Sequence, residues 1–277
     1  MHTTSIAGVK IGFSGFKNEG FLLERFTVLD AKHTSFRFIL DGSPPPGFAL
    51  SSGIGHYNGR YPLFFSIRDG ACALLEEEGR LIRIFTPDVR KEKVSNITAF
   101  MLSICLLKYD ALMMHAALVD IDGEGLLFIG RSGIGKTTQA EQWARHRGAL
   151  IINGDNTFVR KQDGEFWAHG SPWHGSSPYC ENRKTKLRAI VALEQSPFNR
   201  IERLMGLDAV LRGESNVFLP GWRKENMAGA LAVFDDLLAH IPLFLLECRV
   251  DREAVDMTYS AVFGVQLNGQ SDGEQGK

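Results

Sequence analysis

The chain has 277 residues, of which 44% are apolar and 23% are charged, and this composition is typical of a folded globular protein. Its 31 basic and 32 acidic side chains give a net charge of −1, which argues against a general nucleic-acid binder and against a polybasic membrane-surface protein. The length suits one large domain or two small ones.

No targeting or membrane segment is expected in this sequence. Residues 1–10 lack the basic and apolar regions of a secretory signal, and the most apolar stretch, residues 97–107, is too short to cross a bilayer. The four cysteines are far apart and form no CxxC pair, so a disulfide framework is not expected. These features predict a cytoplasmic protein with neither a membrane partner nor a nucleic-acid partner.

Residues 1–93 are predicted to form a β-rich N-terminal region. Short apolar or alternating runs, separated by clusters of glycine, proline and asparagine that favour turns, occupy residues 9–13, 35–39, 63–67 and 81–85. Each of these runs is predicted to be a strand. No residue pattern in this region points to a particular chemistry.

A helix is predicted over residues 94–114, because apolar residues recur there three and four positions apart. It is apolar on nearly every face, so we expect it to be buried between the two halves of the chain. Further strands are predicted at 117–121, 126–129, 149–152, 157–161, 165–168, 187–193 and 243–250, and further helices at 137–147, 208–212, 224–239 and 252–263. This alternation predicts an α/β domain over residues 94–267, followed by a polar, disordered tail at 268–277.

Residues 130–137, with the sequence GRSGIGKT, match the phosphate-loop pattern GxxxxGK[ST] in full. A predicted strand enters this loop and a predicted helix leaves it, as the motif requires. Glycines let backbone N–H groups converge on an anion, and the helix N-terminus adds partial positive charge. Lys136 is predicted to reach the terminal phosphates and Thr137 to ligate Mg²⁺. The predicted nucleotide-binding residues are Gly130, Ser132, Gly133, Ile134, Gly135, Lys136, Thr137 and Thr138.

Asp155 follows the next apolar strand, which is the arrangement of a Walker-B acid. It lies one helix and one returning strand after Thr137, so it is predicted to hold Mg²⁺ together with that residue. The alternative interpretation is an Asp-Asn turn between two strands, because both residue types favour turns.

Three segments form one pattern: HAALV at 115–119, LLFIGRSGIGKTT at 126–138 and GALIINGD at 148–155. This pattern resembles the HPr serine kinase/phosphorylase family. It looks still closer to the HPr-kinase-like proteins encoded beside peptide-modification genes, as do the segments 170–175 and 187–195. ATP-dependent phosphoenolpyruvate carboxykinase is similar over the phosphate loop and the acid strand. The resemblance covers residues 110–265.

The resemblance implies an α/β P-loop core of the HPr-kinase/carboxykinase type that binds ATP and Mg²⁺. It implies a kinase that transfers the γ-phosphoryl group to a hydroxyl of a peptide, a protein or a small molecule. Lys136 and Asp155 would then be catalytic, and His115 would be a substitute base. The alternative for His115 is a structural residue at a helix–strand junction. The resemblance also implies a homo-oligomer.

The family pattern has two adjacent acids after the second strand, one acting on the attacking hydroxyl and one on the metal, whereas this chain has only one. Gapless counting places Asp155 at the second acid and Gly154 at the first, while a shift by one places Asp155 first and Asn156 at the metal. General-base assistance raises a reaction rate by about 10²–10⁴-fold, so a kinase that lacks one of the two acids would still be able to act, though slowly.

Two alternatives to a kinase remain open. The first is a non-catalytic nucleotide-binding sensor, or a partner subunit of a peptide-modification system, that kept the loop and lost the base. The second, a carboxykinase, has less support because the chain is short and the oxaloacetate-site residues of that family are not recognisable.

Three weaker patterns lie after the phosphate loop. His169, His174 and Cys180 have spacings compatible with metal ligands, but no fourth ligand is evident, so a glycine- and serine-rich loop near the acceptor is favoured. A basic cluster has two interpretations, a solvated surface or a contact with phosphate or an acidic acceptor, and it comprises Arg183, Lys184 and Lys186. Glu194 ends an apolar strand, either as an acid behind the site or as an edge residue.

Overall fold

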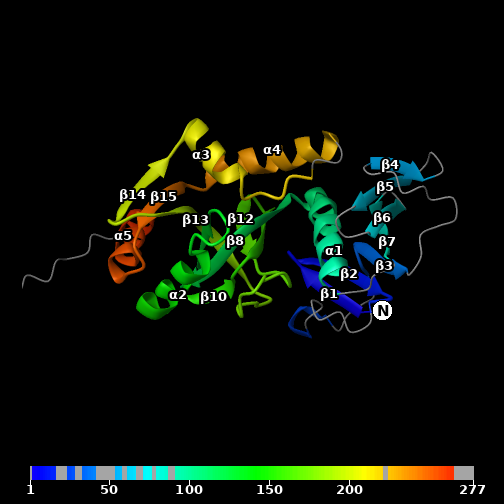
Figure 1. Ribbon diagram of the computed structural model, residues 1–277, viewed down its shortest axis with the longest axis horizontal. Helices are drawn as coiled ribbons and strands as arrows, with labels where there is room; N and C mark the ends of the chain where they lie inside the picture. The colour runs from blue at the N-terminus through cyan, green and yellow to red at the C-terminus, as the bar shows by residue number, and fades with distance from the viewer. Residues whose placement is uncertain are drawn as a thin grey trace, which may run out of the picture.

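The computed structural model describes residues 2–16, 24–28, 33–41, 54–57, 61–66, 71–76, 79–86, 91–220 and 224–264. Two β-sheets dominate this part of the chain, and helix α1 (Lys91–Leu106) lies between them (Figure 1). The burial predicted for this helix between the two halves is therefore confirmed. The tail predicted at 268–277 lies outside the described residues.

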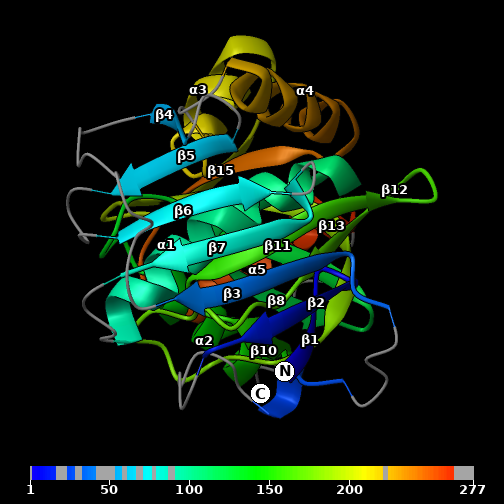
Figure 2. The same ribbon diagram turned by 90° about the vertical axis from the view of Figure 1, so that its right-hand side faces the viewer.

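The N-terminal sheet has seven strands in the order β1-β2-β3-β7-β6-β5-β4, and Figure 2 looks onto it with α1 behind. Its parallel pairs are β2–β3 and β3–β7, and its remaining pairs are antiparallel. The strands are β1 (His2–Ile6), β2 (Val9–Ser14), β3 (Phe36–Asp41), β4 (Ile54–Tyr57), β5 (Tyr61–Ser66), β6 (Ala71–Glu76) and β7 (Leu81–Phe85). The four strands predicted in this region are present, whereas β1, β4 and β6 were not predicted.

The predicted helix 94–114 is wrong at its C-terminal end. Helix α1 ends at Leu106, a short 3-10 turn η3 (Leu107–Tyr109) follows, and β8 (Ala111–Ile121) begins after Asp110. Asp110 has a left-handed backbone with φ 51°, which ends the helical path. The prediction extended the helix into β8 because this strand is buried on both faces. Such a strand is a continuous apolar run in the sequence, and this pattern resembles that of a buried helix.

The C-terminal sheet has eight strands in the order β10-β8-β11-β12-β13-β15-β14, with β9 paired to both β8 and β13. Through these pairings β9 closes a ring of strands with β8, β11, β12 and β13. The remaining bounds are β9 (Glu124–Ile129), β10 (Leu150–Asn153), β11 (Asn156–Gln162), β12 (Glu165–His169), β13 (Lys184–Gln195), β14 (Arg200–Leu204) and β15 (Leu243–Cys248). Strand β14 was not predicted.

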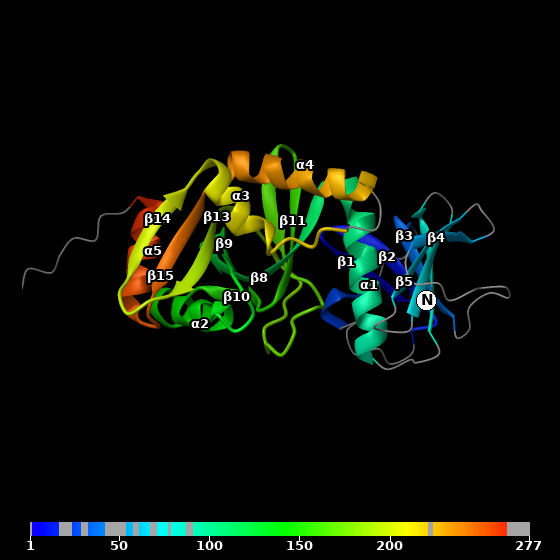
Figure 3. The ribbon, with the colours of Figure 1, turned by 45° about the horizontal axis from the view of Figure 1, so that its top comes forward.

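Four further helices cover this sheet, two on each side (Figures 1 and 3). Helices α2 (Lys136–Arg147) and α5 (Arg252–Phe263) share one apolar cluster, which includes Trp143 and Val255. Helices α3 (Gly206–Glu214) and α4 (Lys224–His240) share another, which includes Ala209 and Phe234. The predicted α/β class is confirmed. Within the described residues, no helix combines the length and the apolar character needed to span a membrane.

A third apolar cluster joins the two sheets through α1. It combines Phe13 and Phe38 of the N-terminal sheet with Phe158 of β11 and with Trp173 and Cys180 of the loop between β12 and β13. Polar contacts run across the same boundary, since Arg160 of β11 donates to the carbonyl of Ala7 at 2.8 Å. The loop after β12 is therefore packed against both halves of the molecule.

Candidate functional site

The glycine-rich loop lies between β9 and α2, as predicted. Gly130, Gly133 and Gly135 have positive φ values of 143°, 78° and 111°, which side chains with a Cβ rarely adopt. A Cβ at Gly133 or Gly135 would meet nothing within 4 Å, so the space in front of the loop is open. The side chain of Ile134 points into the core instead, and its N–H donates to the carbonyl of Arg131 at 3.2 Å. One side of the loop is therefore packed against the core through Ile134, and the other side, at Gly133 and Gly135, is open.

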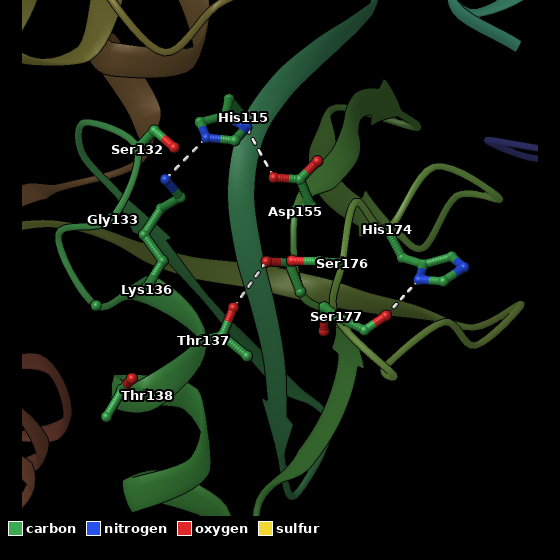
Figure 4. A pocket seen from close by; sticks show the side chains of 12 residues that line it. His115, Ser132, Gly133, Lys136, Thr137, Thr138, Asp155, His174, Ser176 and Ser177 are labelled. Atoms are coloured by element: carbon green, nitrogen blue, oxygen red, sulfur yellow. Dashed lines mark hydrogen bonds and ion pairs between the residues drawn. The ribbon is translucent and has the colours of Figure 1, made fainter. Parts of the chain in front are cut away.

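A pocket of about 290 Å³ opens over this face (Figure 4). It collects residues from four parts of the chain that were predicted separately or not at all. Its lining residues are His115, Ser132, Gly133, Gly135, Lys136, Thr137, Thr138, Gly154, Asp155, His174, Ser176 and Ser177. Most of the predicted site residues are therefore in one place, whereas Gly130 and Ile134 support the loop from outside the lining.

Lys136, His115 and Asp155 form a chain of contacts across the pocket (Figure 4). Lys136 Nζ lies 2.9 Å from His115 Nε2, and His115 Nδ1 lies 3.1 Å from Asp155 Oδ1. An ammonium group has only donors, so Nε2 accepts and the proton of a neutral imidazole is on Nδ1, facing the carboxylate. The side chain of His115 therefore connects the predicted phosphate ligand to the predicted acid.

Electrostatics support this neutral form of His115. Burial lowers the pKa of His115, the charge of Lys136 lowers it further, and Asp155 acts in the opposite direction. Burial also lowers the pKa of Lys136, again opposed by Asp155. Lys136 is only 7% exposed, and its Nζ also donates to the carbonyls of Gly130 at 2.9 Å and Arg131 at 3.3 Å. An anion placed in the pocket would give this ammonium its compensating charge.

The hydroxyl of Thr137 points toward the strand that bears the acid. Thr137 Oγ1 donates to the carbonyl of Gly154 at 3.1 Å, directly before Asp155. The predicted metal pair, Thr137 and Asp155, thus lies on facing sides of one pocket. Within the described residues, no cluster of three or more His, Cys, Asp or Glu side chains forms a metal site. Mg²⁺ needs no such cluster, because it binds through one or two carboxylates, waters and substrate phosphates.

The position of Gly154 has no room for an acidic side chain. A Cβ there would lie 2.0 Å from Ser177 Oγ and 2.4 Å from Ser177 Cβ, so the buried Ser177 fills that space. Asn156, the other candidate for a lost acid, donates through Nδ2 to Asp155 Oδ2. Among the described residues that line the pocket, Asp155 is the single carboxylate.

Two asparagines hold the site together, and the sequence did not reveal either. Asn153 is fully buried, and its Oδ1 accepts the N–H groups of Asp155 and Asn156 at 2.9 and 3.1 Å. Asn216, after α3, accepts the N–H of Gly130 through Oδ1 at 2.8 Å. Its carbonyl accepts the N–H of His115 at 2.7 Å. The bonds of Asn153 reach only two and three residues along the chain, as asparagine side chains do in turns, whereas Asn216 acts across 86 residues and left no signal in the sequence.

The weaker patterns do not form a second site. His169 is buried at the boundary with the N-terminal sheet, His174 lines the pocket and Cys180 is in the core, so the suggested metal ligands are not brought together. The basic cluster does not line the pocket, and Lys186 pairs with Glu165 at 2.6 Å while Lys184 lies over the ring of Trp167. Glu194 pairs with Arg212 at 2.9 Å, which favours the edge-residue interpretation.

The fold and the loop define an α/β protein with a glycine-rich anion-type loop between a strand and a helix. Residues 89–253 match the family described as SynChlorMet cassette protein ScmC, which is more than half of the chain. The chain therefore belongs to this family.

Curated HPr kinase/phosphorylases are similar to part of this chain. The HPr kinase/phosphorylase of Clostridium novyi (strain NT) is 29% identical over 128 residues, which cover 45% of this chain and 37% of the relative. The HPr kinase/phosphorylase of Clostridium botulinum (strain Eklund 17B / Type B) is 33% identical over 98 residues, 35% of this chain and 28% of the relative. The matches thus span about a third of the relatives' length, and they confirm the resemblance predicted from the sequence.

A solved structure described as the Hpr(Ser) kinase/phosphatase from Coxiella burnetii was also matched. Its TM-score is 0.32 at 13% identity, and the match covers 55% of this chain and 88% of that chain.

Proposed function

We propose that this protein is an ATP- and Mg²⁺-dependent kinase that transfers the γ-phosphoryl group to a hydroxyl of a peptide, a protein or a small molecule. The observation that carries the proposal is the contact chain Lys136–His115–Asp155 across a pocket lined by the glycine-rich loop. The names of the curated relatives, which are kinases and phosphorylases, support the same class of reaction.

The phosphates would bind at the open face of the loop. Backbone N–H groups at the start of α2 and the helix dipole favour an anion there, and Gly133 and Gly135 let it approach closely. Lys136 contacts only neutral acceptors within the described residues, namely His115 and two carbonyls. Its ammonium is thus poised to move onto a phosphate oxygen, which is a stronger, charged partner.

Thr137 and Asp155 would hold Mg²⁺ together with the phosphates, and the ion would supply positive charge that neutralises the phosphate oxygens. The donor set fits, since it offers one hydroxyl and one carboxylate in a pocket that leaves room for waters and phosphate oxygens.

Asp155 would also receive the proton of the acceptor hydroxyl. His115 Nδ1–H orients the carboxylate by donating to Oδ1, and Asn156 donates to Oδ2. Each carboxylate oxygen keeps a second lone pair for an incoming hydroxyl. Phosphoryl transfer depends mostly on positioning and charge, so a single carboxylate is enough for transfer at a modest rate.

The proposal is tested with γ-labelled ATP and a panel of serine- and threonine-containing peptides, proteins and small alcohols. We expect label transfer by the wild-type chain and a loss of about 10²–10³-fold in rate for Lys136→Ala, the size typical of removing one group that stabilises developing charge. Lys161→Ala is the matched control, because Lys161 pairs with Asp236 away from the pocket. Equal rates in wild type and Lys136→Ala would place the reaction elsewhere.

A nucleotide-binding sensor without catalysis is the second candidate, and the filling of the Gly154 position by Ser177 favours it. Calorimetry separates the two candidates. Binding of ATP without turnover over the whole acceptor panel would support the sensor, and one confirmed phosphorylated product would end it. The homo-oligomer, the cytoplasmic location and the domain boundaries at 93 and 267 stay predictions.

A further inference from the structure

The loop between β12 and β13 reaches into the pocket and is fixed at several points. Ser171 Oγ donates to the carbonyl of Asn156 at 2.6 Å, and Glu181 N donates to the carbonyl of Ile152 at 2.8 Å. Trp173 is buried, and its Nε1 donates to Ser95 Oγ of α1 at 2.9 Å. Residues 171–181 are therefore a built wall of the pocket rather than a loose surface loop.

The tip of this loop touches the strand end that bears the acid at two successive points. Gly175 has φ 59°, and a Cβ there would lie 2.9 Å from both Cγ and Oδ2 of Asp155. Ser177 packs against Gly154, as described above. Ser176 lies between these two contacts, so its backbone is held beside the carboxylate.

The two serines of the tip differ in what their hydroxyls do. Ser177 is 8% exposed, and its Oγ accepts the N–H of Tyr179 at 3.2 Å. Ser176 is exposed and lines the pocket together with Lys136 and Asp155, and its hydroxyl makes no hydrogen bond to the described residues. Figure 4 shows Ser176 across the pocket from the phosphate loop, between Asp155 and Ser177. Ser176 thus presents its hydroxyl to the pocket that also contains the carboxylate of Asp155 and the glycine-rich loop.

We propose that Ser176 is a self-phosphorylation site of this protein, an inference that rests on the proposed kinase function. Ser176 Oγ attacks the γ-phosphorus of ATP bound at the loop, and an Oγ–P bond forms. The bond from the γ-phosphorus to the β,γ-bridging oxygen breaks, and its electrons leave with ADP. The hydroxyl proton passes to the carboxylate of Asp155, so the step needs no further reactant.

The position of the loop explains why the transfer is intramolecular. Ser176 lines the same pocket as Lys136 and Thr137, so its hydroxyl shares the space in which the γ-phosphate would lie. Holding two reacting groups in one site replaces an encounter between molecules by a local approach. The extent of labelling should accordingly follow a first-order course whose rate constant is independent of protein concentration.

The experiment uses the full chain with ATP and Mg²⁺, read by intact mass and by fragmentation of the phosphorylated peptide. We expect a gain of one phosphoryl group at Ser176, and its loss in Ser176→Ala and in Lys136→Ala. Ser196→Ala is the control, because Ser196 lies in the turn between β13 and β14, outside the pocket lining. It should be labelled like the wild type.

A mixing experiment tests the intramolecular course. Ser176→Ala keeps the phosphate loop, and Lys136→Ala keeps the acceptor, so a mixture of the two should acquire no label. Label at Ser177 or elsewhere, or transfer between the two variants, would overturn the inference. ATP consumption or transfer to an added acceptor with Ser176 unmodified overturns the inference but not the kinase. A chain that does not bind ATP overturns both.

Discussion

The two sheets of this protein divide the work differently. The C-terminal sheet, helix α2 and the loops that connect the strands and helices of this half supply every described residue that lines the pocket, and the N-terminal sheet supplies none. Yet the N-terminal half supports one wall of the site from behind, because Trp173 and Cys180 belong to the apolar cluster that contains Phe13 and Phe38. The residues that line the pocket thus belong to the C-terminal half, whereas part of the packing behind them comes from the N-terminal half. The loop after β12 takes part in both, because it lines the pocket and packs in this apolar cluster.

Polar contacts reinforce the same division. Arg25 of the short 3-10 helix η1 (Glu24–Phe26) pairs with Glu181 at 2.8 Å, but both side chains are exposed, and such pairs contribute little. The contact between Trp173 and Ser95 is partly buried and so contributes more. The comparison predicts that changes in the C-terminal half alter the reaction, whereas changes in the N-terminal half alter stability and the loop.

The largest effect is expected for Asp155→Asn. The amide cannot accept the acceptor's proton and carries no charge for Mg²⁺, whereas its oxygen still accepts from His115 Nδ1 at the position now 3.1 Å away. We expect the rate of phosphoryl transfer to fall by about 10²–10⁴-fold, the range of general-base assistance. Steady-state kinetics with labelled ATP over a Mg²⁺ titration measure the loss.

Asp256→Asn is the control for this variant, since Asp256 of α5 pairs with Arg147 of α2 at 2.6 Å and neither residue lines the pocket. It should keep the wild-type rate. An unchanged rate and an unchanged Mg²⁺ dependence in Asp155→Asn would show that this carboxylate neither accepts the proton nor holds the metal. The assignment of the reaction to the C-terminal half would then be wrong.

The local parts of the site were predictable from the sequence. The phosphate loop and helix α2 follow from glycine spacing and a Gly148 cap, whose φ of 69° ends the helix where predicted. Helix α5 has the bounds that were predicted, and its ends coincide with two local signals, since Asp251 caps it and Gly264 ends it. Signals of this kind depend on neighbours in the chain, so one sequence reveals them.

The parts that depend on distant contacts were not predictable. Ser177 fills the space beside Gly154, and Asn216 binds the backbone of Gly130 across a separation of 86 residues. Neither contact leaves a periodicity or a motif. The extent of β8 was missed for a related reason, since a strand buried on both faces by tertiary packing has the pattern of a buried helix.

The boundary between the two halves should be sensitive to acid through His169. Burial, followed by the charges of Lys184 and Arg160, lowers the pKa of His169 from 6.5 to about 3. The folded state therefore holds it neutral, while the unfolded chain protonates it near its ordinary pKa of about 6.5. Stability is complete above this value and falls as the pH drops from 6.5 toward 3, by on the order of a few kcal/mol.

Replacing this imidazole tests the assignment. His169→Gln is neutral at every pH, so its free energy of unfolding should depend less on pH between 6.5 and 4 than that of the wild type. Denaturant unfolding at several pH values measures the difference, with His2→Gln as the control because His2 is exposed at the start of β1. If the two variants lose stability with acid to the same extent, another group causes the loss.

A smaller effect is expected for Asn216→Ala, which removes the support of the phosphate loop. The N–H of Gly130, which is half-buried, would lose its partner, and a buried donor without one costs about 1–3 kcal/mol at most. Part of this cost should appear as weaker binding of ATP, on the order of tenfold, because about 1.4 kcal/mol corresponds to tenfold. Calorimetry gives the affinity, and thermal unfolding gives the stability.

Asn199→Ala is matched to this change, since Asn199 bonds Asp251 and Glu253 far from the pocket lining. It should lose stability without losing affinity for ATP. If Asn216→Ala behaved in the same way, the contact with Gly130 would be structural only, and nucleotide binding would not need the side chain of Asn216.

The smallest effect is expected for Ser95→Ala, and it tests whether helix α1, which lies between the two sheets, supports the loop after β12. Trp173 Nε1 would lose its bond to Ser95 Oγ but keep the backbone carbonyl of Ser95 at 3.2 Å, so the loss of stability should be about 0.5–1.5 kcal/mol. Affinity for ATP should stay within about twofold, because no ligand of the phosphates moves. The loop tip, however, should open more often.

Hydrogen exchange measures how often the loop tip opens. The amide of Ser177 bonds to the carbonyl of His174 at 3.0 Å, so its exchange reports on the tip of the loop. Ser103→Ala is the control on the same helix, since Ser103 Oγ donates within α1 to the carbonyl of Phe100. Faster exchange of Ser177 in Ser95→Ala than in Ser103→Ala shows that α1 holds the wall of the pocket. Equal exchange in both would show that the hydroxyl of Ser95 does not hold the tip, and the remaining contacts of the loop, among them those of Ser171 and Glu181, would then fix its position.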